Sequence, residues 1–104
     1  MMEQLVAKFL PRFTALARER LRKAGAIAAE RRHEQAEAAA HDMHSLAGEA
    51  GLLGLEGVIP IARRAEEAAR RFGATGGEAE AQALGECVMA LERAVNEATA
   101  ERPS

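Results

Sequence analysis

Large aromatic residues and cysteine are scarce in this chain of 104 residues. It contains no tryptophan, no tyrosine and only three phenylalanines, so bulky aromatic side chains cannot dominate its core. The single cysteine, Cys87, excludes an internal disulfide and agrees with a reducing compartment.

The patterns of membrane, β-sheet and nucleic-acid-binding proteins are missing too. No apolar run approaches the ~20 residues of a membrane span, and no alternating run of Val, Ile and Thr predicts a strand. The net charge of −2 gives no electrostatic basis for binding nucleic acid. Residues 1–8 lack the continuous apolar segment of a signal peptide. We therefore expect a cytoplasmic protein with no membrane and no nucleic-acid partner.

Alanine, glutamate and arginine dominate the sequence instead, a composition typical of a helical bundle with small-residue contacts. The length favours one domain over residues 1–104. Apolar residues recur at three- and four-residue steps in four segments, which predict helices at about 3–24, 31–54, 57–72 and 78–100. Short links between them predict an all-α, antiparallel up-down-up-down four-helix bundle.

Each predicted helix carries an apolar stripe, and proline and glycine suggest where the helices end or bend. Pro11 indicates a kink or a restart in the first helix, whereas Gly25 is a candidate for its end. Pro60 belongs in a first turn, so the third helix should begin no earlier than about Gly57. Residues 73–77 are predicted to form a flexible loop. The stripes consist of Leu5, Val6, Phe9, Phe13, Leu16, Ala17 and Leu21; of Val58, Ile61, Ala65, Ala68 or Ala69, and Phe72; and of Leu84, Val88, Leu91, Val95 and Ala98, with Cys87 beside the last stripe as a small core residue.

The segment around His44 organises the chain. At about 100° per residue, one arc of the second helix collects apolar residues and predicts its core face. His44 points roughly 140° away from the centre of that arc, towards water. Gly48 follows one turn later on the same outer face, with Gly51 beside it. A glycine inside a helix costs about 1 kcal/mol relative to alanine, and these two add no packing. They leave room for the surface of another protein to reach the imidazole ring. The arc consists of Ala36, Ala39, Met43, Leu46, Ala50 and Leu53.

This pattern resembles the histidine phosphotransfer (HPt) family of two-component phosphorelays. The family motif combines a histidine, an aliphatic residue, a glycine, a small residue and a second glycine, followed by apolar or small residues and a closing acidic or polar residue. The lysine that usually precedes the first glycine is replaced here by Ala47. The matching positions are His44, Leu46, Gly48, Ala50 and Gly54, then Val58, Ile61, Ala62, Ala65 and Glu66.

The resemblance implies that His44 is a phosphoacceptor. It would exchange a phosphoryl group with the aspartate of a response-regulator receiver domain, with a hybrid histidine kinase as a further partner. It also implies that the receiver holds Mg²⁺, so we expect no cofactor and no metal in this chain. The sequence has no P-loop or other Gly-rich nucleotide loop. We therefore expect a phosphoryl carrier rather than an enzyme.

Several neighbours are candidates to support His44. Arg63 and Arg64 are predicted to supply the positive charge that Ala47 lacks. His41 lies one turn before His44, where its ring would touch and tune it or be an unrelated surface group. Leu52 and Leu55 fall near the same face and are predicted to bind the receiver.

Other interpretations of this segment stay open. Glu37, His41 and His44 share one face on which a zinc ion could bind, although a fourth ligand is missing. Frequent glycines allow the second helix to end near Gly48, leaving His44 at a helix end. The chain could also be a helical-bundle adaptor that carries no phosphate, or a degenerate HPt domain that only binds receivers.

Overall fold

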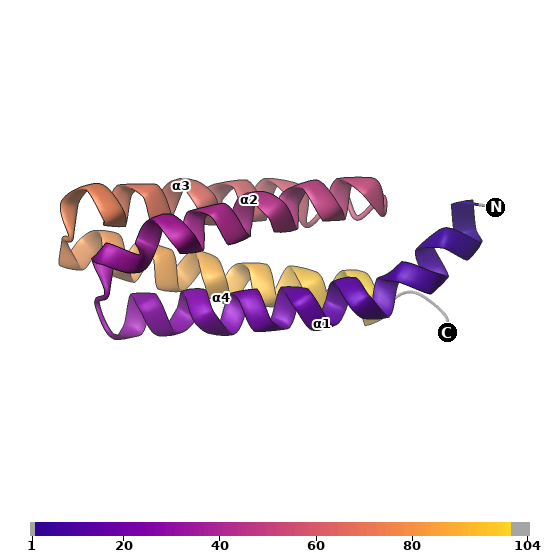
Figure 1. Cartoon of the computed structure of the whole chain (residues 1–104), viewed down its shortest axis with the longest axis horizontal. Helices are drawn as coiled ribbons and strands as arrows, with labels where there is room; N and C mark the ends of the chain where they lie inside the picture. The colour runs from indigo at the N-terminus through magenta and orange to yellow at the C-terminus, as the bar shows by residue number, and fades with distance from the viewer. Residues whose placement is uncertain (1, 101–104) are drawn as a thin grey trace.

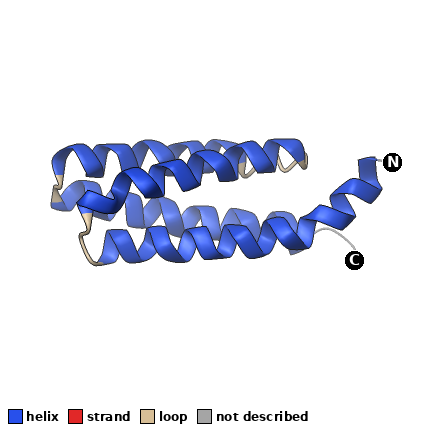
Figure 2. Cartoon of the chain, viewed as in Figure 1, coloured by secondary structure: helices blue, strands red, loops and turns tan. Residues whose placement is uncertain are grey.

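The chain folds into four α-helices and one short 3-10 helix. The computed structural model describes residues 2–100, with the side chains of residues 2, 3 and 5 excepted. The elements are α1 (Met2–Ala29), η1 (His33–Gln35), α2 (Ala36–Leu52), α3 (Ile59–Thr75) and α4 (Glu78–Ala100). Short loops join them, and the described part contains no strand (Figure 2). The prediction of an all-α fold is confirmed.

The helices run alternately up and down and form an elongated four-helix bundle (Figure 1). Each helix packs against its neighbours in the chain, and α1 and α4 close the ring. This arrangement follows from one apolar stripe per helix and from links too short for a crossover. None of the described helices combines the length and apolar character needed to cross a membrane.

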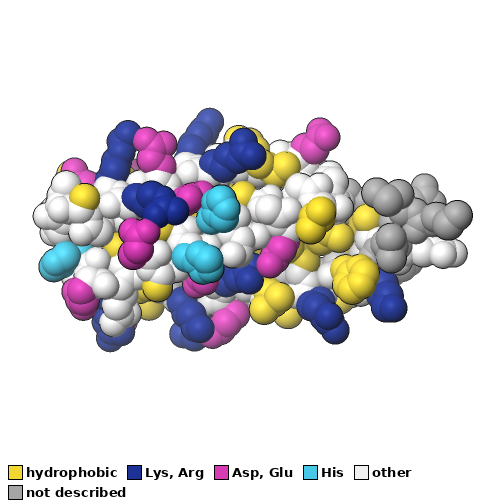
Figure 3. Space-filling view, turned by 45° about the horizontal axis from the view of Figure 1, so that its top comes forward, with side chains coloured by type: hydrophobic (Ala, Val, Ile, Leu, Met, Phe, Trp, Pro, Cys, Tyr) yellow, Lys and Arg dark blue, Asp and Glu magenta, His cyan; other side chains and the backbone are white. Residues whose placement is uncertain are grey.

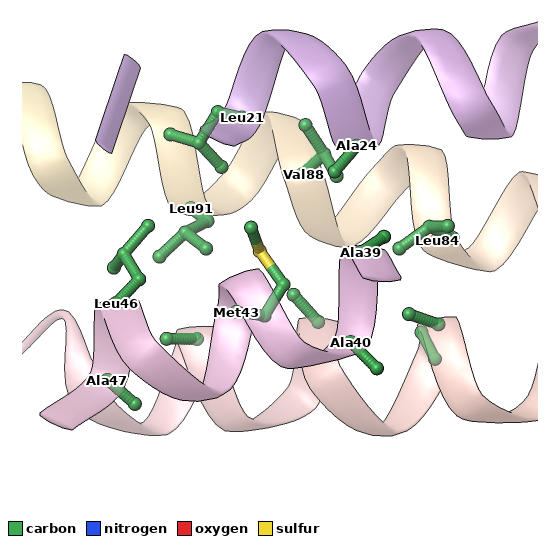
Figure 4. Packing of buried hydrophobic residues seen from close by; sticks show 14 of the residues in the cluster. Leu21, Ala24, Ala39, Ala40, Met43, Leu46, Ala47, Leu84, Val88 and Leu91 are labelled. Carbon is green, nitrogen blue, oxygen red and sulfur yellow. The ribbon is translucent and has the colours of Figure 1, made fainter. Parts of the chain in front are cut away.

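Alanine dominates the core and lets the helices approach closely. Figure 4 shows Met43 and Leu46 pointing from α2 towards α1 and α4, while Ala40 and Ala47 point towards α3. The largest fully buried side chains are Phe72, Met43, Leu46, Leu84, Leu91, Val58 and Val95. The predicted stripes of α2, α3 and α4 therefore do face the core, with Ile61, Leu53, Cys87 and Ala98 packed at its margin.

The predicted end of the first helix is wrong, because α1 continues through Gly25 to Ala29. A Cβ atom at Gly25 would lie 3.6 Å from Cγ1 of Val88, an ordinary van der Waals contact, so this glycine lies inside the helix facing α4 and does not end it. Arg31 ends the helix with a left-handed φ of 56°. The Arg31 and Arg32 N–H groups donate to the carbonyls of Ala28 and Ile27, as in a Schellman cap.

The second and third helices are also displaced from their predicted bounds. α2 begins at Ala36 rather than residue 31, because η1 precedes it, and it ends at Leu52 rather than residue 54. Gly54, with φ 72°, provides the left-handed turn. α3 begins at Ile59 with Pro60 in its first turn, as predicted. It continues to Thr75 before the left-handed Gly76, so the predicted loop 73–77 shrinks to two residues.

Pro11 lies inside α1, whose first turns leave the bundle at an angle (Figure 1). A proline lacks the N–H for a helical hydrogen bond and causes such a bend. The stripe of α1 is correspondingly only partly buried. Phe13, Ala17 and Leu21 are buried, whereas Phe9 and Leu16 are exposed, contrary to prediction. Leu5, also placed on this stripe, lies outside the described side chains.

Candidate functional site

His44 stands on the outer face of an unbroken helix. Its side chain is 69% exposed, whereas Met43 and Leu46 beside it are fully buried and anchor α2 in the core. Because α2 continues to Leu52, the alternative in which the helix ends near Gly48 is wrong. The bundle therefore displays this imidazole from a rigid support.

A carboxylate from α3 contacts the ring. Oε1 of Glu66 lies 3.2 Å from Nδ1 of His44. The Glu66 side chain is only 17% exposed, because it lies between α2 and α3. The sequence analysis matched Glu66 to the closing acidic position of the family motif but predicted no contact for its side chain. The feature of the sequence that could have indicated this contact is a polar residue directly after the buried stripe residue Ala65.

The charge of Glu66 determines which ring nitrogen carries a proton. A hydrogen bond from Arg70 lowers the pKa of the Glu66 carboxyl, and the contact with His44 lowers it further. An ionised carboxylate only accepts hydrogen bonds, so Nδ1 of His44 must be the N–H donor. In the neutral ring, Nε2 then holds a free electron pair. The contact with Glu66 thus favours the tautomer in which Nε2 is the unprotonated nitrogen.

An arginine that the sequence analysis did not single out, Arg70, pairs with the carboxylate beside His44. Nη2 of Arg70 donates to Oε2 of Glu66 over 2.8 Å, and Nη1 donates to Oε1 of Glu37 over 2.5 Å. Burial raises the pKa of the Cys87 thiol on α4, and the positive charge of Arg64 opposes this effect.

Arg63 makes no ion pair or hydrogen bond among the described side chains. Neither Arg63 nor Arg64 forms an ion pair with His44 or Glu66 among the described side chains, and a role for either as the cation beside His44 stays a prediction. Neither position is hydrogen-bonded to Glu66, whereas Arg70 is. Arg70, which does pair with Glu66, lies one helical turn after it on α3.

Gly48 leaves the surface beside His44 open. It is exposed, and a Cβ atom built on it would meet nothing within 4 Å. Gly51 differs, because its Cβ would lie 3.7 Å from Cδ1 of Ile59 at the start of α3. Ala47 is 8% exposed and packs towards α3 (Figure 4). His41 is exposed, and no hydrogen bond joins it to His44 among the described side chains.

Only one of the two leucines predicted to bind a receiver lies on the surface. Leu52 is 81% exposed, whereas Leu55 is 4% exposed and belongs to the core. The left-handed Gly54 reverses the chain and turns Leu55 inwards, where its N–H donates to the carbonyl of Ala50. The prediction for Leu55 is therefore wrong.

Leu52 borders an apolar groove between the first turns of α1 and the end of α2. The groove encloses about 340 Å³ and carries Arg12 and Glu49 as its charged residues. Figure 3 shows hydrophobic side chains gathered at this end of the face, and histidine and charged side chains gathered at its middle. The apolar lining is Val6, Phe9, Phe13, Leu16, Leu52 and Leu53.

The described residues contain no group of three or more His, Cys, Asp or Glu side chains able to hold a metal ion. The zinc alternative with Glu37, His41 and His44 therefore lacks a ligand cluster. Comparisons with protein-family models, curated proteins and solved structures give no match for this chain. The chemistry that the geometry supports is nucleophilic attack by an exposed, oriented imidazole.

Proposed function

We propose that this protein is a phosphorelay intermediate, which accepts a phosphoryl group on His44 from the aspartate of a response-regulator receiver domain and donates it to another. The observation that carries the proposal is the contact of 3.2 Å between Nδ1 of His44 and Glu66, on a ring that is 69% exposed. The contact leaves Nε2 as the reactive nitrogen. The HPt resemblance of residues 43–66 points to the same histidine.

The transfer is a displacement at phosphorus. The electron pair of Nε2 attacks the phosphorus of the aspartyl phosphate, and an N–P bond forms as the P–O bond breaks. The electron pair of that P–O bond leaves on the aspartate carboxylate. The ring then carries a positive charge shared with its Nδ1–H, which faces the Glu66 carboxylate. Donation to a second receiver reverses these steps.

This chain would contribute the nucleophile, its orientation and a binding surface. A rigid helix holds the ring for in-line attack, which lowers the entropic part of the barrier. The receiver would bring Mg²⁺ and most of the charge stabilisation, as the family resemblance implies. The protein is thus proposed as a carrier without an ATP-binding site, working with receivers and a hybrid histidine kinase in the cytoplasm.

The surface around His44 suits a protein partner. Gly48 offers bare backbone one turn from the ring, with nothing within 4 Å of the position of its absent Cβ. Further along α2, Leu52 exposes 81% of its surface at the edge of the apolar groove. An exposed apolar patch of this kind is typical of an interaction site. We assign it to the receiver because it continues the face that displays His44.

The test is phosphoryl transfer from receiver domains of the source genome. The protein is incubated with each phosphorylated receiver, and the label is examined for stability in acid and base. Label that is acid-labile and base-stable, and that is lost in His44→Gln but kept in His41→Gln, supports the proposal. Potassium phosphoramidate, a small phosphoryl donor, tests the reactivity of the ring without a partner. Absence of label on His44 from every receiver and from phosphoramidate would refute the proposal.

The second candidate is a degenerate HPt domain or adaptor that binds receivers without carrying phosphate. One observation favours it: Ala47, at the position of the family lysine, is 8% exposed, and no cation stands there. The same experiment separates the two functions. Receiver binding that is retained without any label on His44 identifies the adaptor.

A further inference from the structure

The pair formed by His44 and Glu66 is part of a longer series of side-chain contacts between α2 and α3. Arg70 of α3 donates to Glu66 over 2.8 Å and to Glu37 of α2 over 2.5 Å. Glu37 and His44 lie two turns apart on α2, and Glu66 and Arg70 lie one turn apart on α3. Two contacts therefore join α3 to α2: that of Arg70 with Glu37 and that of Glu66 with His44.

The chemistry of Arg70 suits its central place. Its planar guanidinium presents several N–H donors in a fixed fork, so one side chain can hold two carboxylates at once. The side chain is 48% exposed, and Glu37 is 74% exposed, so each contact alone is weak. Together they restrict the rotamers of Glu66, which is the least exposed of the three at 17%.

We propose that Arg70, held by Glu37, is a positioning residue that keeps the Glu66 carboxylate against Nδ1 of His44 and so fixes the ring in the tautomer with Nε2 unprotonated. Arg70 does not touch the ring and acts through Glu66. Its consequence for phosphoryl transfer rests on the proposed function. Its effect on the tautomer does not, and can be measured without any partner.

The experiment is ¹⁵N NMR of the histidine rings in the intact protein, at a pH where the rings are neutral. The shifts of Nδ1 and Nε2 report the ratio of the two tautomers, and His44→Gln assigns the His44 signals. The variants are Arg70→Ala, Arg70→Lys and Glu37→Gln. The matched control is Arg71→Ala, which removes an equal charge from the next residue of α3, where Arg71 pairs only with Glu67 over 2.6 Å among the described side chains.

We expect Arg70→Ala to lower the ratio of the Nδ1–H to the Nε2–H tautomer of His44 about threefold to tenfold, as the loss of a charge-assisted contact implies. Glu37→Gln should lower it less, and Arg70→Lys should restore part of it. Arg71→Ala should leave it unchanged. With phosphoramidate, labelling of His44 should slow in the same order.

A tautomer ratio in Arg70→Ala equal to that in Arg71→Ala would overturn the proposal. If Arg70→Ala loses its helical circular dichroism, wild-type ratios in both Arg70→Lys and Glu37→Gln would overturn it instead. The two proposals fail separately. A tautomer shift without label on His44 contradicts the phosphorelay function alone, and label without a tautomer shift contradicts the role of Arg70 alone.

Discussion

His33 in η1 and His44 in α2 are both exposed, yet their contacts differ. The side chain of His33 is 55% exposed and that of His44 is 69% exposed. His33 packs edge-on against Phe72, with ring centroids 6.2 Å apart, and closes the end of the bundle near Gly76. His44 has a carboxylate at Nδ1, and one turn further along α2 a Cβ atom at Gly48 would meet nothing within 4 Å.

This comparison teaches that exposure alone does not distinguish a reactive histidine from a structural one. The ring of His33 covers a core aromatic side chain, so its environment stabilises the fold. The ring of His44 contacts no aromatic side chain among those described, and its polar partner orients it. Both rings have a carboxylate near Nδ1, Glu34 at 3.7 Å from His33 and Glu66 at 3.2 Å from His44. Packing against Phe72, which only His33 makes among the described side chains, separates the two environments.

The largest effect on stability should come from the core beneath His33. Phe72 is fully buried, so Phe72→Ala should lower the free energy of unfolding by about 3–5 kcal/mol. His44→Ala removes a largely exposed side chain and should change it by at most about 0.5 kcal/mol. Urea denaturation followed by circular dichroism measures both. Equal losses in the two variants would contradict the assignment of a structural role to one region alone.

The largest effect on transfer, short of removing His44, should come from the carboxylate beside it. Glu66→Ala should slow phosphoryl transfer to His44 about tenfold, because the ring loses the acceptor that orients it. Glu34→Ala is the control, since Glu34 lies 3.7 Å from Nδ1 of His33. It should leave the rate unchanged. Single-turnover labelling by a phosphorylated receiver measures both rates, and identical rates would remove the distinction between the carboxylates.

Replacing either of two glycines by alanine, one near each histidine, should change the stability of the protein in opposite directions. Gly48 is helical with open space around it, so Gly48→Ala should stabilise the protein by about 0.5–1 kcal/mol. Gly76 has φ 64°, and its Cβ would lie 3.3 Å from Cγ of His33, so Gly76→Ala should destabilise it by about 1 kcal/mol or more. Thermal and urea unfolding provide the check. A stabilising effect of Gly76→Ala would contradict the close approach of the His33 ring to Gly76.

The smallest effect is an acid-sensitive contribution from Glu66. Its pKa is lowered in the folded state, chiefly by Arg70 and then by His44. The unfolded chain therefore takes up a proton at higher pH than the folded chain, and acid favours unfolding. The contribution is complete above the ordinary carboxyl pKa and is lost as the pH falls through the lower folded value. Glu66→Gln should accordingly be less stable than wild type at pH 7, with the difference vanishing in acid. A difference that persists in acid would show that it has another cause.

Periodicity predicted the inner faces of α2, α3 and α4 because burial selects residues at helical spacing. Met43, Leu46 and Ala50 are buried as the wheel requires, and His44 is exposed. The ends of the helices were harder to predict, because a glycine can either end a helix or lie inside one. Gly25 lies inside α1, and Arg31 takes the left-handed position at the end of the helix instead.

The contacts of the site were largely beyond sequence reasoning. A helical pattern orients each side chain about its own axis, but it leaves open how far two helices slide past one another. One turn of slide decides whether position 63, 66 or 70 of α3 faces His44. The structure places Glu66 against the ring and Arg70 behind it. The turn at Gly54, which buries Leu55, was equally unreadable from periodicity.

The sequence by itself determined the number of helices, their inner faces and the exposure of His44, because each follows from local spacing of apolar residues along one helix. Only the tertiary structure decided which groups meet that imidazole. Glu66, Arg70 and Glu37 come together through the axial offset of α2 and α3, which depends on how all four helices fill a common core.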